Sequence, residues 1–198
     1  MLKRYGQLDG LIDHYQPECV LDVGIWNGWR AARLMRWGEF LIGFDLFEEN
    51  PSISQRDLNV KTPCSLGDCS VFLANRGSRH HLLQGDSRET VPRWSMRCSR
   101  SPDLAFLGGG HSAETIRSDF EAIAARCEVM ILDDYYVGDI DTEEFGCNRV
   151  LESRAHTVLP WSDPVRDSDG NEIGQIHLAL CEVSERIAVN RSHLRVVQ

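Results

Sequence analysis

Five short apolar runs, separated by helical patterns and polar loops, constrain the fold of this chain more than any other feature. The runs lie at residues 19–23, 40–44, 81–84, 104–107 and 129–132. Between them, we expect helices over residues 29–37, 66–74 and 112–126. Strands that alternate with helices in this way are typical of a mostly parallel sheet with helices packed on its faces.

The last part of the chain has a different pattern. A short helix is expected at 148–153, followed by two arms at 157–159 and 174–180 that are joined by a turn through 167–171. These arms predict an antiparallel hairpin at the end of the sheet. Residues 92–102 begin and end with proline and are expected to be irregular. A length of 198 residues suits a single domain, 1–198.

The charge and composition exclude several classes of protein. With 21 basic and 30 acidic residues, the net charge is −9, which argues against a broad electrostatic grip on nucleic acid or anionic membranes. No apolar run approaches the roughly 18 residues of a membrane span, and the first ten residues lack the apolar stretch of a signal peptide. The seven cysteines form no C-x-x-C pair that would suggest zinc. We therefore expect a cytoplasmic protein.

The first candidate binding element follows the first strand. Gly24 comes directly after that strand and Gly28 four residues later, where the next helix begins. Glycine allows the backbone to approach a ligand closely, and the free N–H groups at a helix start can face it. The spacing lacks the middle glycine of G-x-G-x-x-G, which counts against NAD and FAD. In the same helix we expect Arg30, Arg33 and Arg36 to form a solvated face.

Acidic residues stand at the ends of the next two strands. Asp45 can accept hydrogen bonds from ribose hydroxyls, and its negative charge would strengthen them. Asp86 can meet the exocyclic amine of adenine, or it can cap the helix that starts at Ser87. Ligands of open α/β sheets bind outside the carboxyl ends of the strands, where these residues would lie.

The order of these motifs resembles the half of class I methyltransferases that binds S-adenosylmethionine (SAM). Within that class, the segment 24–28 (GIWNG) resembles the G-V-W-R-G of macrocin-type sugar O-methyltransferases. Residues 106–112 (FLGGGHS) are similar to the I-D-G-x-H-S/T of the same group and its relatives, and residues 132–135 (LDDY) contain their D-D-Y. The resemblance implies a Rossmann-like, seven-stranded, mostly parallel sheet with helices on both faces and a C-terminal antiparallel hairpin.

The resemblance also implies roles for individual residues. Asp22, Gly24 and Gly28 would line the methionine end of SAM, Asp45 would bind the ribose, and Asp86 would bind the adenine. His111 would be the general base. Asp133 and Asp134 would hold a divalent cation, usually magnesium. This chain has Gly108 where the relatives have an aspartate ligand, and a hard cation needs several oxygen ligands. The loss of that carboxylate should weaken the cation site severely.

The case for His111 also stands on the sequence itself. His111 follows three glycines after the fourth strand and precedes Ser112, which marks a helix start. It should therefore sit at the ligand-binding edge of the sheet. An imidazole, with an ordinary pKa near 6.5, can accept a proton at neutral pH. Methyl transfer to an alcohol requires a base that removes the hydroxyl proton as the oxygen attacks the methyl group.

We therefore expect a SAM-dependent O-methyltransferase acting on a hydroxyl of a small molecule, with a sugar as one such acceptor. Two alternatives stay open: a SAM-binding protein that has lost catalysis, which Gly108 favours, and another Rossmann-like nucleotide-dependent enzyme. We expect no nucleic-acid or membrane partner. A homodimer is common for such enzymes, although the sequence establishes neither the oligomeric state nor the acceptor.

Overall fold

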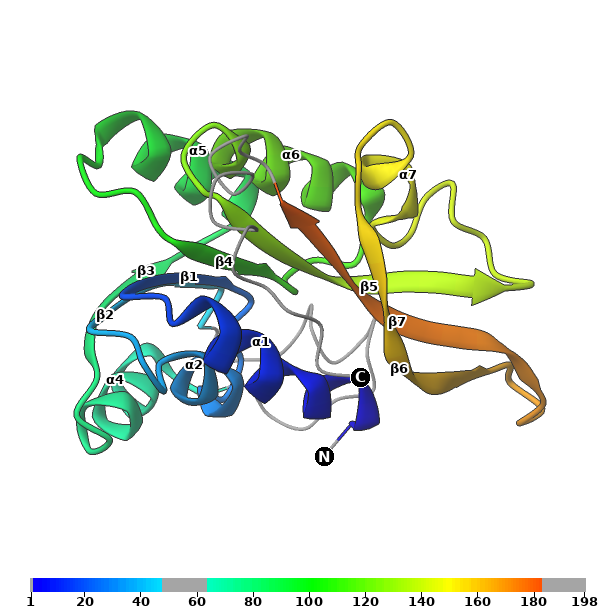
Figure 1. The fold of residues 1–198 in the computed structure, drawn as a ribbon, viewed down its shortest axis with the longest axis horizontal. Helices are drawn as coiled ribbons and strands as arrows, with labels where there is room; N and C mark the ends of the chain where they lie inside the picture. The colour runs from blue at the N-terminus through cyan, green and yellow to red at the C-terminus, as the bar shows by residue number, and fades with distance from the viewer. Residues whose placement is uncertain (1, 48–63, 183–198) are drawn as a thin grey trace.

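A single mixed sheet of seven strands organises the molecule. The computed structural model describes residues 2–47 and 64–182, and the strands of its sheet follow the order β3-β2-β1-β4-β5-β7-β6 (Figure 1). β1 to β5 run parallel, while β7 is antiparallel to both β5 and β6. The strands are β1 (Cys19–Val23), β2 (Phe40–Asp45), β3 (Arg79–Gln84), β4 (Leu104–Leu107), β5 (Val129–Gly138), β6 (Thr157–Arg166) and β7 (Glu172–Glu182). The predicted fold class is confirmed.

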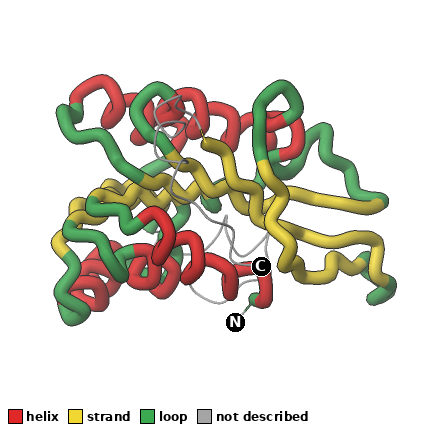
Figure 2. The backbone as a smooth tube through the Cα atoms, viewed as in Figure 1, coloured by secondary structure: helices red, strands yellow, loops and turns green. Residues whose placement is uncertain are grey.

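Helices cover both faces of this sheet, as Figures 1 and 2 show. One face carries the 3-10 helix η1 (Lys3–Gln7), α1 (Leu8–Tyr15), α2 (Trp29–Leu34) and α4 (Leu66–Ala74). The other carries α5 (Ser87–Arg97), α6 (Ala113–Ala124) and α7 (Asn148–Leu151). Each face has its own apolar core. All residues of the central strands β1 and β4 are buried, as expected for parallel strands covered on both sides.

The segment 92–102 was wrongly predicted to be irregular throughout. Helix α5 continues through Pro92 and ends at Arg97. Proline removes one helical hydrogen bond, but Asp86 caps the helix by accepting from the Arg88 N–H at 2.9 Å. Val91 and Trp94 are buried against the sheet on either side of the proline. This packing outweighs the missing bond.

The amino-terminal segment forms structure that the sequence patterns did not predict. Helices η1 and α1 cross one face of the sheet, with Leu8 and Ile12 fully buried. The backbone N–H groups of Lys3 and Arg4 both donate to the Asp163 carboxylate on β6, at 2.8 and 3.1 Å. The first residues of the chain are thereby fastened to the far edge of the sheet.

Among the described helices, none has the length and apolar character that a membrane span requires.

Candidate functional site

The loops after β1 and β4 touch at the carboxyl edge of the sheet. Gly24 has a φ of +84°, and a Cβ there would lie 2.5 Å from the Cα of Gly109. Gly28, with a φ of +79°, precedes α2, and a Cβ there would lie 3.0 Å from the Phe72 ring. Positive φ and close backbone contact both favour glycine at Gly24. This contact brings the glycine loop next to the loop that carries His111.

Asp45 lies beside the same glycine loop. Its Oδ2 accepts a hydrogen bond from the Trp26 N–H at 2.6 Å, and its Oδ1 accepts one from the Phe47 N–H at 3.1 Å. Backbone donors thus hold the carboxylate at the end of β2. A carboxylate oxygen has more than one acceptor site, so each oxygen can still accept a ribose hydroxyl. The structure thus brings Asp45, the residue predicted to bind the ribose, next to the predicted glycine loop.

Asp22 lies below this edge, inside the protein. It is fully buried and pairs with Arg30, whose Nη2 is 2.8 Å from Oδ1. The Arg30 guanidinium lies over the Phe106 ring, with Cζ 4.2 Å from its centroid. The prediction of a solvated arginine face was therefore wrong for Arg30, whose side chain is only 14% exposed. The helix pattern could not reveal this, because the partner of Arg30 comes from the preceding strand.

Asp86 is the N-cap residue of α5. Besides the capping bond to the Arg88 backbone, its carboxylate pairs with the Arg88 guanidinium at 2.6 Å. This pairing lowers the pKa of Asp86. The structure therefore supports the capping role. The adenine contact stays a prediction.

His111, in the loop after β4, and Asp134, in the middle of β5, form a hydrogen-bonded pair. The Nδ1 of His111 lies 2.5 Å from Oδ2 of Asp134, whose side chain is 4% exposed, whereas the His111 side chain is 35% exposed. Asp134 adopts a φ of +60° where the register between β5 and β7 shifts. The hydrogen bond to Asp134 raises the pKa of His111 against the opposing effect of burial. With Nδ1 directed at Asp134, Nε2 is the nitrogen that can take a proton from a ligand.

Asp133 has different partners from its neighbour. Its Oδ1 accepts from Arg4 Nε at 2.9 Å and from the Asp134 N–H at 2.9 Å. Its Oδ2 accepts from the Tyr5 hydroxyl and, at 3.4 Å, from Arg4 Nη2. The two aspartates expected to share a cation are thus engaged separately.

The surroundings of these aspartates do not suit a divalent cation. Within residues 2–47 and 64–182, no three His, Cys, Asp or Glu side chains gather as metal ligands. A Cβ at Gly108 would lie 2.7 Å from the Phe106 ring and 3.0 Å from Arg30 Nη1. The place of the missing aspartate is therefore next to a guanidinium. Both aspartates instead pair with basic side chains of the protein itself, Asp133 with Arg4 and Asp134 with His111.

Sequence reasoning missed Arg4, Tyr5 and Asp163. Arg4 is 7% exposed and also pairs with Asp163, at 3.0 Å. The first ten residues contain few apolar positions and no motif that indicates a site. Their partners lie more than a hundred residues away along the chain. Arg4 could have been identified only from its pairing with Asp133 and Asp163, and the sequence alone does not show which distant residues pair.

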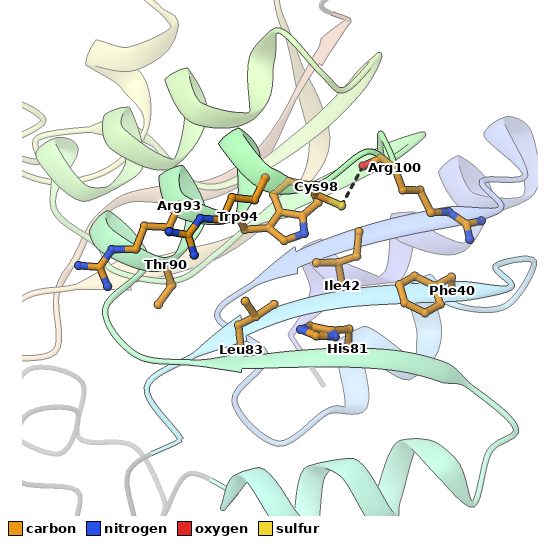
Figure 3. A pocket seen from close by; sticks show the side chains of 10 residues that line it. Phe40, Ile42, His81, Leu83, Thr90, Arg93, Trp94, Cys98 and Arg100 are labelled. Carbon is orange, nitrogen blue, oxygen red and sulfur yellow. Dashed lines mark hydrogen bonds between the residues drawn. The ribbon is translucent and has the colours of Figure 1, made fainter.

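The described part of the chain also contains a cavity away from these residues. It has a volume of about 480 Å³ and lies between β2, β3 and α5 (Figure 3). Its wall is largely apolar, with Phe40, Ile42 and Trp94 exposed to it. None of the predicted site residues lines it. It therefore belongs to the packing of α5 on the edge of the sheet, and we do not include it in the candidate site.

A comparison with protein families identifies the class of this chain. The sequence profile of a family described as a methyltransferase domain matches residues 21–135, which is more than half of the chain. The chain belongs to this methyltransferase family. The matched region begins within β1 and ends within β5, and it contains β2 to β4, all of α6 and both aspartates of β5. The predicted class is confirmed.

Solved structures agree with this fold. The O-methyltransferase TomG from Streptomyces achromogenes, solved with SAM, has a TM-score of 0.59 at 14% identity, over 89% of this chain and 78% of its own. An O-methyltransferase from Bacillus cereus, solved with SAH, has a TM-score of 0.59 at 15% identity, over 88% and 78%. A putative rRNA methylase from Clostridium thermocellum has a TM-score of 0.60 at 17% identity, over 93% and 98%. Among proteins of curated function, none matches the chain.

Proposed function

We propose that this chain is a SAM-dependent O-methyltransferase that acts on a hydroxyl of a small molecule. The observation that carries the proposal is the His111–Asp134 pair, which lies beside the glycine loop and therefore beside the expected methyl donor. Two similar structures, TomG and the Bacillus cereus enzyme, are named O-methyltransferases and were solved with SAM or SAH.

The donor would bind along the carboxyl edge of β1 and β2. Asp45 would accept hydrogen bonds from the ribose hydroxyls, and Gly24 and Gly28 would let the backbone approach the methionine end. Asp22 would act from below that end through Arg30, to which it is bonded. Asp86 would meet the adenine at the end of β3. SAM supplies a methyl group that is activated by its sulfonium charge.

His111 would remove the proton of the acceptor hydroxyl. The acceptor oxygen would then bond to the methyl carbon that SAM supplies, with the S–C bond broken and SAH as the leaving group. The hydroxyl proton passes to Nε2 of His111 and then to water. Asp134 keeps the imidazole oriented through Nδ1 and stabilises its charged form. Most of the remaining rate enhancement would come from holding the acceptor oxygen in line with the methyl group.

The acceptor class rests on charge. A net charge of −9 disfavours RNA, whereas a neutral small molecule such as a sugar meets no such repulsion. The likeness to a putative rRNA methylase makes RNA the competing acceptor. A cytoplasmic homodimer is part of the same proposal. Two alternatives are a protein that binds SAM without catalysis and an enzyme that binds another nucleotide. Titration with SAM and NAD, together with a methyl-transfer assay, distinguishes them from the proposal.

Calorimetric titration with SAM, SAH and NAD is the first test of this proposal. We expect SAM and SAH to bind and NAD not to bind. The second test is transfer of labelled methyl from SAM to a panel of sugars, other small alcohols and ribosomal RNA. Transfer to RNA alone would replace the small-molecule acceptor. SAM binding without transfer to any acceptor would favour the non-catalytic alternative.

A further inference from the structure

Arg4 is a buried cation placed against the first of the two aspartates of β5. The guanidinium of Arg4 contacts both oxygens of Asp133, at 2.9 and 3.4 Å, while the side chains of Arg4 and Asp133 are 8% and 5% exposed. Tyr5 donates its hydroxyl to the same carboxylate. A carboxylate with this many donors has little capacity left for a further cation.

The position of Arg4 is fixed by contacts on three sides. Nη1 of Arg4 pairs with Asp163 at 3.0 Å, the Arg4 N–H donates to the same carboxylate, and Cζ lies 4.7 Å from the Tyr5 ring centroid. Removing one partner of a buried ion pair leaves an uncompensated charge, which is strongly unfavourable. A cation from solution would have to displace this arrangement to reach Asp133.

A second arginine lies next to the position of the third carboxylate of the predicted cation site. Arg30 pairs with Asp22, and its Nη1 is 3.0 Å from the point where a Cβ at Gly108 would stand. The third expected carboxylate is absent because residue 108 is glycine, and the Arg30 guanidinium lies at its place. Arg4 thus balances Asp133, which would face a divalent cation in the relatives this chain resembles, and Arg30 lies where their third carboxylate would stand.

We propose that Arg4 occupies Asp133 in place of a divalent cation, so that this chain transfers its methyl group without a metal ion. The chain of contacts runs from Arg4 to Asp133 and from Asp133 Oδ1 to the Asp134 N–H, at 2.9 Å in each step. That second bond supports the left-handed conformation of Asp134, which in turn holds His111. Arg4 is thus a positioning residue for the His111–Asp134 pair. That methyl transfer takes place rests on the proposed function, whereas the occupation of Asp133 by Arg4 and Tyr5 does not.

Titration with Mn²⁺, followed by electron paramagnetic resonance, tests the inference without an acceptor. The variants are Arg4→Ala and Arg4→Lys, with Arg36→Ala as the control because the Arg36–Asp13 pair is exposed. We expect the parent, Arg4→Lys and Arg36→Ala to bind Mn²⁺ only at millimolar concentrations. Arg4→Ala, which frees Asp133, should bind it roughly tenfold or more tightly.

Micromolar binding of Mn²⁺ by the parent, lost in Asp133→Asn, would overturn the inference. So would a folded Arg4→Ala variant whose Mn²⁺ affinity equals that of the parent. If Arg4→Ala does not fold, as judged by circular dichroism, the parent and Asp133→Asn titrations still decide. Once an acceptor is known, the parent rate should be unchanged by EDTA. A failure to find methyl transfer would refute the proposed function while leaving the Mn²⁺ result intact.

Discussion

The glycine loop after β1 and the aspartate pair within β5 lie at the same edge of the sheet, but different contacts hold them. The glycine loop is shaped by backbone conformation and by backbone N–H donors to Asp45, all within about 25 residues of sequence. The aspartates are held by side chains from the first turn of the chain and from β4's loop. The glycine loop with Asp45, the donor half of the site, therefore depends on backbone contacts, including the one with Gly109. The aspartates with His111, the acceptor half, depend on side-chain charge pairs.

Arg4→Ala should have the largest effect on stability. Loss of one partner leaves Asp133 buried with an unbalanced charge, which typically costs about 3–5 kcal/mol. Urea unfolding of the parent and the variant measures this difference. Arg36→Ala removes an exposed pair and should cost less than about 1 kcal/mol. Equal losses for the two variants would show that Asp133 does not depend on Arg4.

Asp119 offers a buried carboxylate without an arginine for comparison. It is 1% exposed, Ser87 donates to one oxygen, and the other has no partner within the described structure. Burial raises the pKa of Asp119 to about 7. The folded protein therefore holds a proton that the unfolded chain has released, and its stability falls as the pH rises from about 4 to 7.

Asp119→Asn should remove that loss. At pH 8 we expect the variant to be more stable than the parent by on the order of 3 kcal/mol, with the gain shrinking toward pH 4. Thermal unfolding across this pH range measures it. Asp13→Asn, at an exposed carboxylate, serves as the control and should change the stability at pH 8 by less than about 1 kcal/mol. A gain for Asp119→Asn that is constant with pH would contradict the titration of this carboxyl group.

Asp45→Ala tests the donor half alone. Loss of a charged acceptor for the ribose hydroxyls should weaken SAH binding by about 1.5–3 kcal/mol, measured by calorimetry. Asp45→Asn keeps one oxygen acceptor and should lose less. Asp13→Ala, on the surface of α1, should bind SAH like the parent. Unchanged affinity in Asp45→Ala would remove the ribose assignment and with it the donor site at this edge.

How much could be predicted follows the same division. The strands at 19–23 and 104–107 were predicted with their observed bounds, because fully buried parallel strands are continuous apolar runs. The strand-end residues Gly24, Asp45 and His111 could be located because position after a strand determines the edge they reach. Arg4 and Arg30 could not, since only the fold brings them to buried aspartates. Helix α5 was cut short because proline is a local signal, while the packing of Trp94 is not.

The most direct test compares methyl transfer by the parent and by His111→Ala, with SAH affinity measured on the same samples. The account predicts that the variant binds SAH like the parent, because the donor contacts lie elsewhere on the edge. Its turnover of the accepted hydroxyl compound should fall by about 10²–10⁴-fold, as is typical when a general base is lost. Equal turnover of the two proteins between pH 6 and 9 would contradict the central claim that His111 takes the proton.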